Sequence, residues 1–191
     1  MSQLPVNKTK VASAILPAGS WNIDRDHSGV EFVARLLGSR VRGRFTGFTG
    51  VITVDPDPSR SFAEVTIDAA SIDTDNKKRD AHLRSSAFLD VEEFPILTFR
   101  SMSVTPPQAD GSFRVEGDLT IRGVTRAVVL DALYLGSSDE PSGSKRAKFS
   151  ARTELDREEF GVSWNILGSI RKRVQIELEI EAIWRADSAQ E

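Results

Sequence analysis

The side chains best suited to chemistry in this sequence lie between residues 79 and 82. Arg79, Asp80 and His82 follow a run of charged residues, and the stretch around them has the spacing of a short helix. Because residues three apart share one face of a helix, Arg79 and His82 can point the same way. A guanidinium suits a phosphate or carboxylate, so one interpretation is a polar mouth that hydrogen-bonds the head of a ligand.

The same residues also fit a structural role, and their types favour it. In that case Asp80 caps the helix or forms a salt bridge, Arg79 pairs with a loop carboxylate, and His82 bonds a strand backbone group. Arg157 has the same two alternatives, and an internal ion pair that fastens the helix to the sheet is the preferred one. The candidate mouth residues are therefore Arg79, Asp80, His82 and Arg157.

An enzymatic alternative makes His82 a general acid or base oriented by Asp80, with Ser71 or Ser85 as nucleophile. The sequence contains no Gly-x-Ser-x-Gly elbow, no His-Glu-x-x-His pair and no cysteine. Two histidines far apart in the sequence do not make a multi-histidine metal centre. We predict no catalytic residue, no metal and no cofactor, and we keep a lipid-modifying enzyme as the alternative to a binding protein.

The charge balance argues against a nucleic-acid partner. The chain of 191 residues has 25 basic and 28 acidic side chains, a net charge of −3, which gives no general attraction for phosphate backbones. The weaker alternative of a barrel that binds a single strand rests on alternating arginines near two aromatic residues. These residues are Arg35, Arg40, Arg42, Arg44, Phe45 and Phe48.

The elements that must position these residues are strands. Residues 174–184 alternate apolar and polar side chains with a period of two, which is typical of an antiparallel sheet with one dry and one wet face. Similar patterns bring the total to about eight strands, enough to close a small barrel. The predicted strands are 30–36, 41–45, 50–54, 64–72, 96–104, 113–122, 126–135, 148–155 and 174–184. A helical insertion is expected near residues 76–90.

Four blocks of sequence resemble one known family in their order along the chain. The first consists of WNID at 21–24 followed by HSGVEF at 27–32, and the others are SIDTDNKKRDAHLRSSAFLDVEEFPILTF at 71–99, GDLTIRGVT at 117–125 and LDREEFGVSWN at 155–165. Together these blocks are similar to the YceI-like family of lipocalin-like lipid-binding barrels. The resemblance implies an all-β, closed antiparallel barrel that holds a long apolar chain of the polyisoprenoid or fatty acid or amide type. It implies no established catalytic residue, and it implies a homodimer.

The apolar faces of the predicted strands can form a solid core or line a tunnel, and alternation does not distinguish the two. The resemblance favours the tunnel, while glycines such as Gly43 are expected to bend strands or leave room for the ligand. We expect the tunnel to be lined or capped by Phe32, Val65, Ile67, Leu83, Phe88, Phe99, Phe113, Val115, Leu119, Phe149, Trp164, Ile176 and Leu178.

The predicted organisation is one domain, residues 20–186, between flexible tails at 1–19 and 187–191. Lys8 and Lys10 precede a short apolar run that Pro17 ends too early for a normal signal peptide. No apolar run reaches the roughly 20 residues that span a bilayer. We therefore expect a cytoplasmic protein without a transmembrane segment, and the resemblance keeps a periplasmic or secreted location open.

Overall fold

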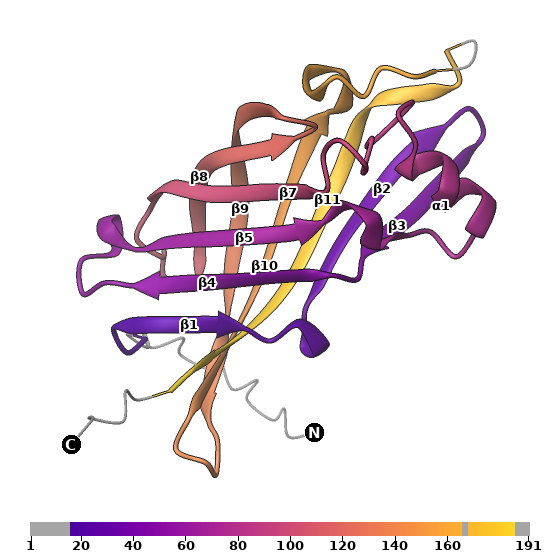
Figure 1. The fold of residues 1–191 in the computed structure, drawn as a ribbon. Coiled ribbons are helices and arrows are strands. Elements are labelled where there is room, and N and C mark those ends of the chain that lie inside the picture. The colour runs from indigo at the N-terminus through magenta and orange to yellow at the C-terminus, as the bar shows by residue number, and fades with distance from the viewer. Residues whose placement is uncertain (1–15, 166–167, 186–191) are drawn as a thin grey trace, which may run out of the picture.

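The dominant feature of the computed structural model, which describes residues 16–165 and 168–185, is an antiparallel sheet closed on itself (Figure 1). Eight strands of this described part form the closed ring, because β1 pairs with both β4 and β11. In ring order they are β1 (Gly19–Ile23), β4 (Phe48–Val54), β5 (Phe62–Asp68), β7 (Ile96–Val104), β8 (Ser112–Ile121), β9 (Val124–Asp139), β10 (Lys145–Asp156) and β11 (Ile170–Trp184). The predicted closed barrel is confirmed.

Three further strands extend one side of the barrel. β2 (Gly29–Leu36) pairs with β11, β3 (Ser39–Phe45) pairs with β2, and the short β6 (Ile72–Asp73) pairs with β3. β11 therefore shares one edge between two partners, since β1 pairs with its last residues and β2 with its first half. Four short 3-10 turns connect the elements: η1 (Arg25–His27), η2 (Pro58–Arg60), η3 (Ala69–Ser71) and η4 (Arg157–Phe160).

The alternating sequence of β11 determines which way its side chains face. Val174, Ile176 and Leu178 point into the barrel, and the charged Glu177 and Glu179 between them lie on the opposite face. β10 follows β11 in an unbroken register of twelve residue pairs, from Lys145 with Trp184 to Asp156 with Arg173. Period-two patterning thus separates an apolar interior from a charged exterior.

The insertion between β6 and β7 contains a shorter helix than the sequence predicted. Helix α1 covers Lys77–Arg84, and the residues up to 94 form turns instead of continuing it. The helix begins where the side chain of Asn76 accepts a hydrogen bond from the Arg79 N–H (3.0 Å), a regular N-cap. It ends at Ser85, whose N–H and hydroxyl both donate to the His82 carbonyl (3.1 and 2.7 Å).

The strand predicted over 64–72 is also shorter than expected. β5 ends at Asp68, because the side chain of Asp68 accepts a hydrogen bond from the Ala70 N–H (2.9 Å) and closes the turn η3. The chain then leaves β5 and adds β6 to the edge of β3. This change of direction carries α1 toward β2 and β3 and away from β5 (Figure 1).

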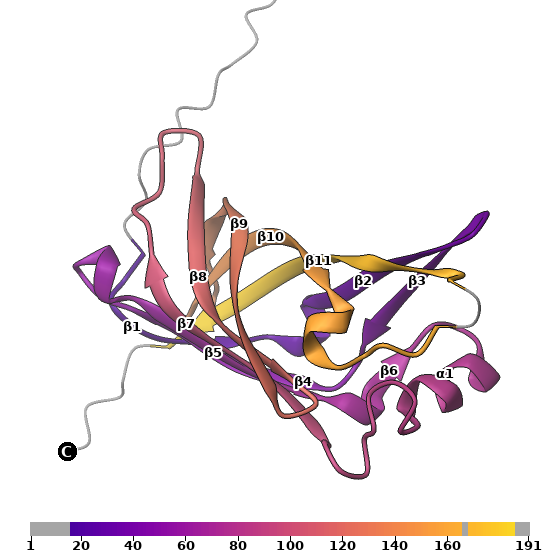
Figure 2. The same ribbon diagram turned by 90° about the horizontal axis from the view of Figure 1, so that it is seen from above.

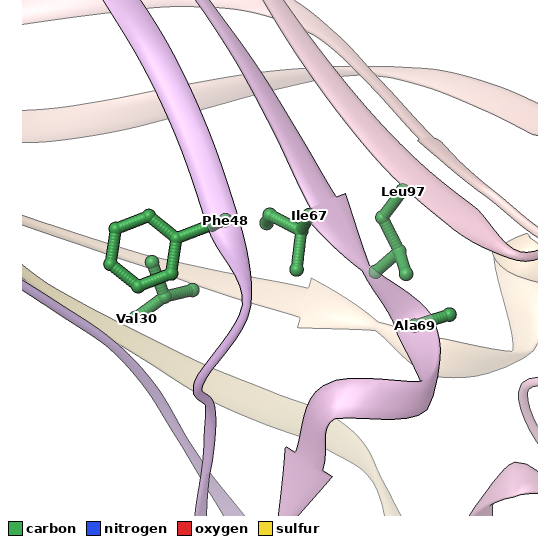
Figure 3. Packing of buried hydrophobic residues seen from close by; sticks show 5 residues of the cluster. All are labelled: Val30, Phe48, Ile67, Ala69 and Leu97. Carbon is green, nitrogen blue, oxygen red and sulfur yellow. The ribbon is translucent and has the colours of Figure 1, made fainter. Parts of the chain in front are cut away.

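One cluster of buried side chains fastens β2 to the strands across the barrel. Val30 of β2, Phe48 of β4, Ile67 of β5 and Leu97 of β7 pack together with Ala69. Figure 3 shows the ring of Phe48 next to Val30, with Ile67 between Phe48 and Leu97. The cluster lies near the point where β2 and β3 leave the closed ring, so it holds the two parts of the sheet together.

The barrel has two unlike ends. At the helix end lie α1, the turn between β2 and β3, and η4, while the opposite end, called the loop end, carries the connections at residues 55–61 and 105–111 (Figures 1 and 2). Strands β7, β8 and β9 run between the two. Any space inside the barrel is therefore bounded by a helical cover on one side and by loops on the other.

Candidate functional site

The interior of the barrel is hollow. A cavity of about 770 Å³ extends from Pro58 and Pro107 at the loop end to His82 and Trp164 at the helix end. This volume lies within the roughly 300–1,000 Å³ of pockets that enclose small ligands. Because the lining side chains are almost all aliphatic or aromatic, the cavity is suited to an apolar occupant.

All thirteen side chains that the sequence analysis assigned to a tunnel lie on the wall of this cavity. They come from the insertion, from the segment after η4 and from strands β2, β5, β7, β8, β10 and β11. Whether each of them touches a ligand stays a prediction. The set is Phe32, Val65, Ile67, Leu83, Phe88, Phe99, Phe113, Val115, Leu119, Phe149, Trp164, Ile176 and Leu178.

Sequence reasoning missed part of the wall, mainly on the strands that leave the ring and on β9. The missed residues include Leu36, Val41, Phe45, Leu130, Ala132, Tyr134 and Ile180. Most of them obey the same alternation as the predicted ones, so extending the period-two pattern along every strand would have found them. The Tyr134 hydroxyl is buried and has no hydrogen-bond partner among the described residues.

Glycines shape the wall by accommodating aromatic rings. Gly43 of β3 lies opposite Phe32 of β2, and a Cβ at Gly43 would lie 2.4 Å from the Phe32 ring. Gly117 of β8 lies opposite Ser101 of β7 and accommodates the ring of Phe99 on the same strand, since a Cβ at Gly117 would lie 2.7 Å from that ring. At Gly43 the sequence left two alternatives, a bent strand or room for the ligand, and that room is occupied by the Phe32 ring.

An aromatic cluster forms part of the helix end. The His82 ring centroid lies 4.5 Å from that of Trp164 and 5.1 Å from that of Phe88, both in edge-on geometry, and Phe88 and Trp164 are 5.0 Å apart. No hydrogen bond to the His82 ring occurs in the part of the chain that the structure describes. The expected bond from His82 to a strand backbone group is therefore replaced by packing against two aromatic rings.

Arg79 and Asp80 both hold Thr74. The Thr74 N–H donates to Asp80 Oδ1 (2.9 Å), and its hydroxyl donates to the same oxygen. Arg79 Nε donates to Thr74 Oγ1 (2.8 Å) and Nη2 to the Thr74 carbonyl oxygen (2.8 Å), in place of the expected loop carboxylate. Arg79 lines the cavity together with His82, whereas Asp80 is buried behind it. Asp80 therefore fastens the helix start.

Arg157 fastens a loop, and the sequence analysis expected it to fasten the helix. Its buried guanidinium donates to the carbonyl oxygens of Val162 (2.5 Å), Trp164 (3.1 Å), Arg171 (3.2 Å) and Ile170 (3.4 Å). Its carboxylate neighbour is Glu158, on the same turn, at 3.7 Å. Arg157 thus holds the segment that carries Trp164 to the cavity wall.

Arg122 joins two parts of the helical cover, a role that sequence reasoning missed. With Gly123 it forms the two-residue turn between β8 and β9, and both residues have positive φ (51° and 71°). Its Nη1 donates to the carbonyl oxygens of Phe88 (2.7 Å) and Gly161 (3.2 Å). The turn after α1 and the segment after η4 are thereby fixed to the barrel and to each other.

The arrangement does not assemble the enzymatic alternative. Asp80 is bonded to Thr74, and within residues 16–165 and 168–185 no hydrogen bond joins Asp80 to His82. The hydroxyls of Ser71 and Ser85 donate to backbone carbonyl oxygens, those of Asp68 (2.6 Å) and His82 (2.7 Å) respectively. The side chains that would need to form a nucleophile and base are therefore held in other bonds.

The arginines and aromatic rings of the nucleic-acid alternative are not arranged as a basic surface with exposed rings on which bases could stack. Arg42 pairs with Glu31 (2.7 Å) and Glu177 (3.0 Å), so this arginine already has acidic partners. Phe45 lines the cavity and Phe48 belongs to the buried cluster. Neither ring is available to stack on bases from outside.

No helix among the residues that the structure describes has the length and apolar character required to cross a bilayer.

Comparisons with known proteins agree with the fold and the cavity. The family model of the YceI-like domain matches residues 21–182. Protein YceI of Salmonella arizonae is 36% identical over 170 residues, which are 87% of this chain and 87% of that protein. The crystal structure of the Campylobacter jejuni YCEI protein matches with a TM-score of 0.71 and 28% identity, over 78% of this chain and 87% of that chain.

A more distant structure shares the fold alone. The polyisoprenoid binding domain from Saccharophagus degradans matches with a TM-score of 0.63 at 14% identity, covering 87% of this chain and 98% of that chain. The hollow eight-stranded barrel, its helical cover and the match over residues 21–182 thus point to one family. This chain belongs to the YceI-like family.

Proposed function

We propose that this protein binds a long-chain apolar molecule, of the polyisoprenoid or fatty acid or amide type, inside the barrel and sequesters or carries it. The observation that supports the proposal best is the apolar cavity of about 770 Å³. An apolar chain gains about 0.8 kcal/mol for each CH₂ group that it buries, so binding needs no charged anchor. The polyisoprenoid binding domain of the Saccharophagus degradans protein has the same fold, which agrees with this ligand class.

The polar side chains at the helix end suggest where a head group lies. Arg79 and His82 are polar residues on the cavity wall, and His82 packs against Phe88 and Trp164. A ligand with its chain along the barrel axis would place its head near them. Burial of the chain supplies most of the affinity in this arrangement, so we expect loose selectivity for the head.

The direct test is mass spectrometry of an organic extract of the natively purified protein, combined with binding of a fluorescent long-chain probe. We expect a co-purified apolar molecule and saturable probe binding.

The Ala151→Phe variant places a ring in the cavity, whereas Arg152→Phe places the same ring on the outer face of the same strand. Ala151→Phe should lose most probe binding and Arg152→Phe should keep it. No extracted lipid and no saturable binding would contradict the proposal.

The carrier and the enzyme differ in what His82→Ala does. For a carrier, the variant retains its lipid, because the chain is still buried. In an enzyme the variant would retain the lipid as well, but it would lose turnover of a lipid substrate, measured by product formation from the extracted ligand. A His82-dependent product would overturn the carrier.

The proposal includes a homodimer, which the family resemblance implies. Light scattering of the purified protein should then give twice the chain mass of 21.0 kDa. A monomer mass would refute this part of the proposal and leave the cavity function untouched.

A further inference from the structure

The turn of the β2–β3 hairpin and the start of β11 form one basic projection at the helix end. We call residues 35–40 and 168–173 the basic tip (Figure 2). It contains five exposed basic side chains and no acidic one, although the whole chain has a net charge of −3. The five are Arg35, Arg40, Arg171, Lys172 and Arg173. The basic tip therefore carries a positive charge, although the chain as a whole is negatively charged.

The backbone holds the two parts of the basic tip together. Leu36 of β2 pairs with Ile170 of β11, and the Leu37 N–H donates to the Ser169 carbonyl oxygen (2.9 Å). Arg35 and Arg40 are direct cross-strand partners on β2 and β3. Like charges opposite each other in a sheet are destabilising, so placing two arginines at paired positions costs stability.

Three of the five charges have no ion-pair partner in the described part of the chain. Lys172 pairs with Glu158 (2.7 Å), and Arg173 lies 3.9 Å from Glu154. No carboxylate within ion-pair distance of Arg35, Arg40 or Arg171 occurs among residues 16–165 and 168–185. These three charges remain to attract an anionic partner.

An apolar side chain stands among these charges, next to the cavity. Leu37, at the turn of the hairpin, is 76% exposed. Its neighbour Leu36 and the facing Ile170 both line the cavity, as does Trp164. An exposed leucine surrounded by cations is the composition of a segment that enters the headgroup region of a membrane.

We propose that the basic tip docks this protein on the surface of a bilayer that contains anionic phospholipids. The proposal rests on the proposed function, since docking would bring the cavity next to the membrane from which an apolar cargo comes or to which it goes. Cationic side chains are attracted to the negative potential of such a surface, and Leu37 enters the headgroup region. The exposed Lys77 and Lys78 at the start of α1 add charge at the same end of the barrel.

A single-stranded nucleic acid fits the basic tip less well. Recognition of single strands combines a basic groove with exposed aromatic rings for stacking. The aromatic residues nearest along β3 and β4, Phe45 and Phe48, face the interior. The exposed apolar side chain of the tip is a leucine, which enters lipid but offers no face for stacking.

The test is flotation of the purified full chain with vesicles of phosphatidylcholine alone and of phosphatidylcholine mixed with phosphatidylglycerol. We expect binding to the mixed vesicles, little to the neutral ones, and loss at high salt. Each basic side chain near an anionic surface contributes about fivefold in partitioning. The variant Arg35→Gln/Arg40→Gln/Arg171→Gln should therefore bind about 100-fold more weakly.

The matched control removes three positive charges from the outer wall of the barrel: Arg100→Gln/Arg114→Gln/Arg126→Gln on β7, β8 and β9. It should bind the mixed vesicles within a few-fold of the unaltered protein. Leu37→Ser should lower binding about tenfold at unchanged charge, as expected for one leucine withheld from the headgroup region. Equal binding by the tip variant and the control would overturn the proposal.

Two further results separate this proposal from its alternatives. If the unaltered protein ignores the mixed vesicles and shifts a single-stranded oligonucleotide in a gel, and the tip variant does not, the tip is a nucleic-acid surface and the membrane proposal is wrong. Mass spectrometry of the extracted cargo tests the cavity independently. Vesicle binding by a protein that yields no extracted lipid and shows no saturable binding of the long-chain probe would support docking and contradict the proposed function.

Discussion

At the scale of single residues, the wall of the cavity depends on positions where a side chain is absent. Gly43 allows the Phe32 ring to approach the backbone of β3 closely, and Gly117 allows the Phe99 ring to approach that of β8. A phenylalanine kept against the wall leaves the axis of the barrel free. Both glycines therefore contribute to the shape of the cavity without lining it.

The variant Gly43→Ala tests this account. Its Cβ would lie 2.4 Å from the Phe32 ring and 2.7 Å from Thr74 Cγ2, so the ring must turn into the cavity. We expect a loss of about 1–3 kcal/mol in the free energy of unfolding and weaker binding of a long-chain probe. Urea denaturation and probe titration measure the two effects. Gly29→Ala is the control, because a Cβ there meets nothing within 4 Å; unchanged probe affinity in Gly43→Ala would contradict the account.

At the scale of elements, the helical cover is held to the barrel largely by side-chain bonds to backbone groups. Arg84 donates to the carbonyl oxygens of Ala70 (2.7 Å) and Ile72 (2.6 Å), Arg122 to that of Phe88, and Arg157 to that of Trp164. Such bonds fix the position of a segment without adding a strand to the sheet. The cover can therefore loosen while the ring of strands stays intact.

Asp80→Ala should loosen the cover selectively. Asp80 is 6% exposed and Thr74 is 4% exposed, so the variant leaves the N–H and hydroxyl of Thr74 buried without an acceptor. That costs about 1–3 kcal/mol. Hydrogen exchange should speed up at residues 74–90 and stay unchanged in β8 and β9. Lys77→Ala, an exposed position on the same helix, serves as the control. Equal protection of residues 74–90 in both variants would disprove the role of Asp80.

The sequence was sufficient to predict the strands and much of the cavity wall, because period-two alternation indicates which side chains face inward. It was insufficient for the helix boundaries, since the end at Ser85 depends on a hydroxyl and an N–H that bond the preceding turn. It also missed the targets of Arg79 and Arg157. Both bind carbonyl oxygens, and carbonyl oxygens leave no trace in the residue types.

At the scale of the whole molecule, one ionic network joins the two long strands to the segment after β1. Arg146 of β10 donates to Asp24 (2.6 Å), to Glu181 of β11 (2.9 Å) and to Glu140 before β10 (2.7 Å). The hydrogen bond from Arg146 lowers the pKa of Asp24 and of Glu140, and Lys148 followed by Arg146 lowers the pKa of Glu181. The network keeps three carboxylates ionised beside one guanidinium.

These lowered pKa values predict acid sensitivity. A carboxyl group with a lower pKa in the folded chain stabilises the fold above its ordinary pKa, 3.8 for Asp and 4.5 for Glu. That stabilisation is lost as the pH falls through the folded pKa. Arg146→Met should therefore cost about 1–3 kcal/mol at neutral pH and flatten the dependence of stability on pH below about 4.5.

Urea denaturation between neutral and acid pH measures both effects. Arg100→Met is the control, since Arg100 and its partner Glu64 are 71% and 53% exposed and an exposed pair contributes only about 0–1 kcal/mol. A pH profile of Arg146→Met parallel to that of the unaltered protein would show that the network does not set the acid limit.

The division of one edge of β11 between two partners has a mechanical consequence. Among the described residues, the ring is closed by only three residue pairs between β1 and β11, from Trp21 with Trp184 to Ile23 with Ala182, whereas β2 pairs with β11 at Ile170 and from Val174 to Glu179. The barrel can therefore widen at the helix end without breaking the three pairs between β1 and β11 that close the ring. For the function that we propose, this arrangement would allow ligands of different width to enter between the β2–β3 hairpin and the cover while β1 stays paired with β11.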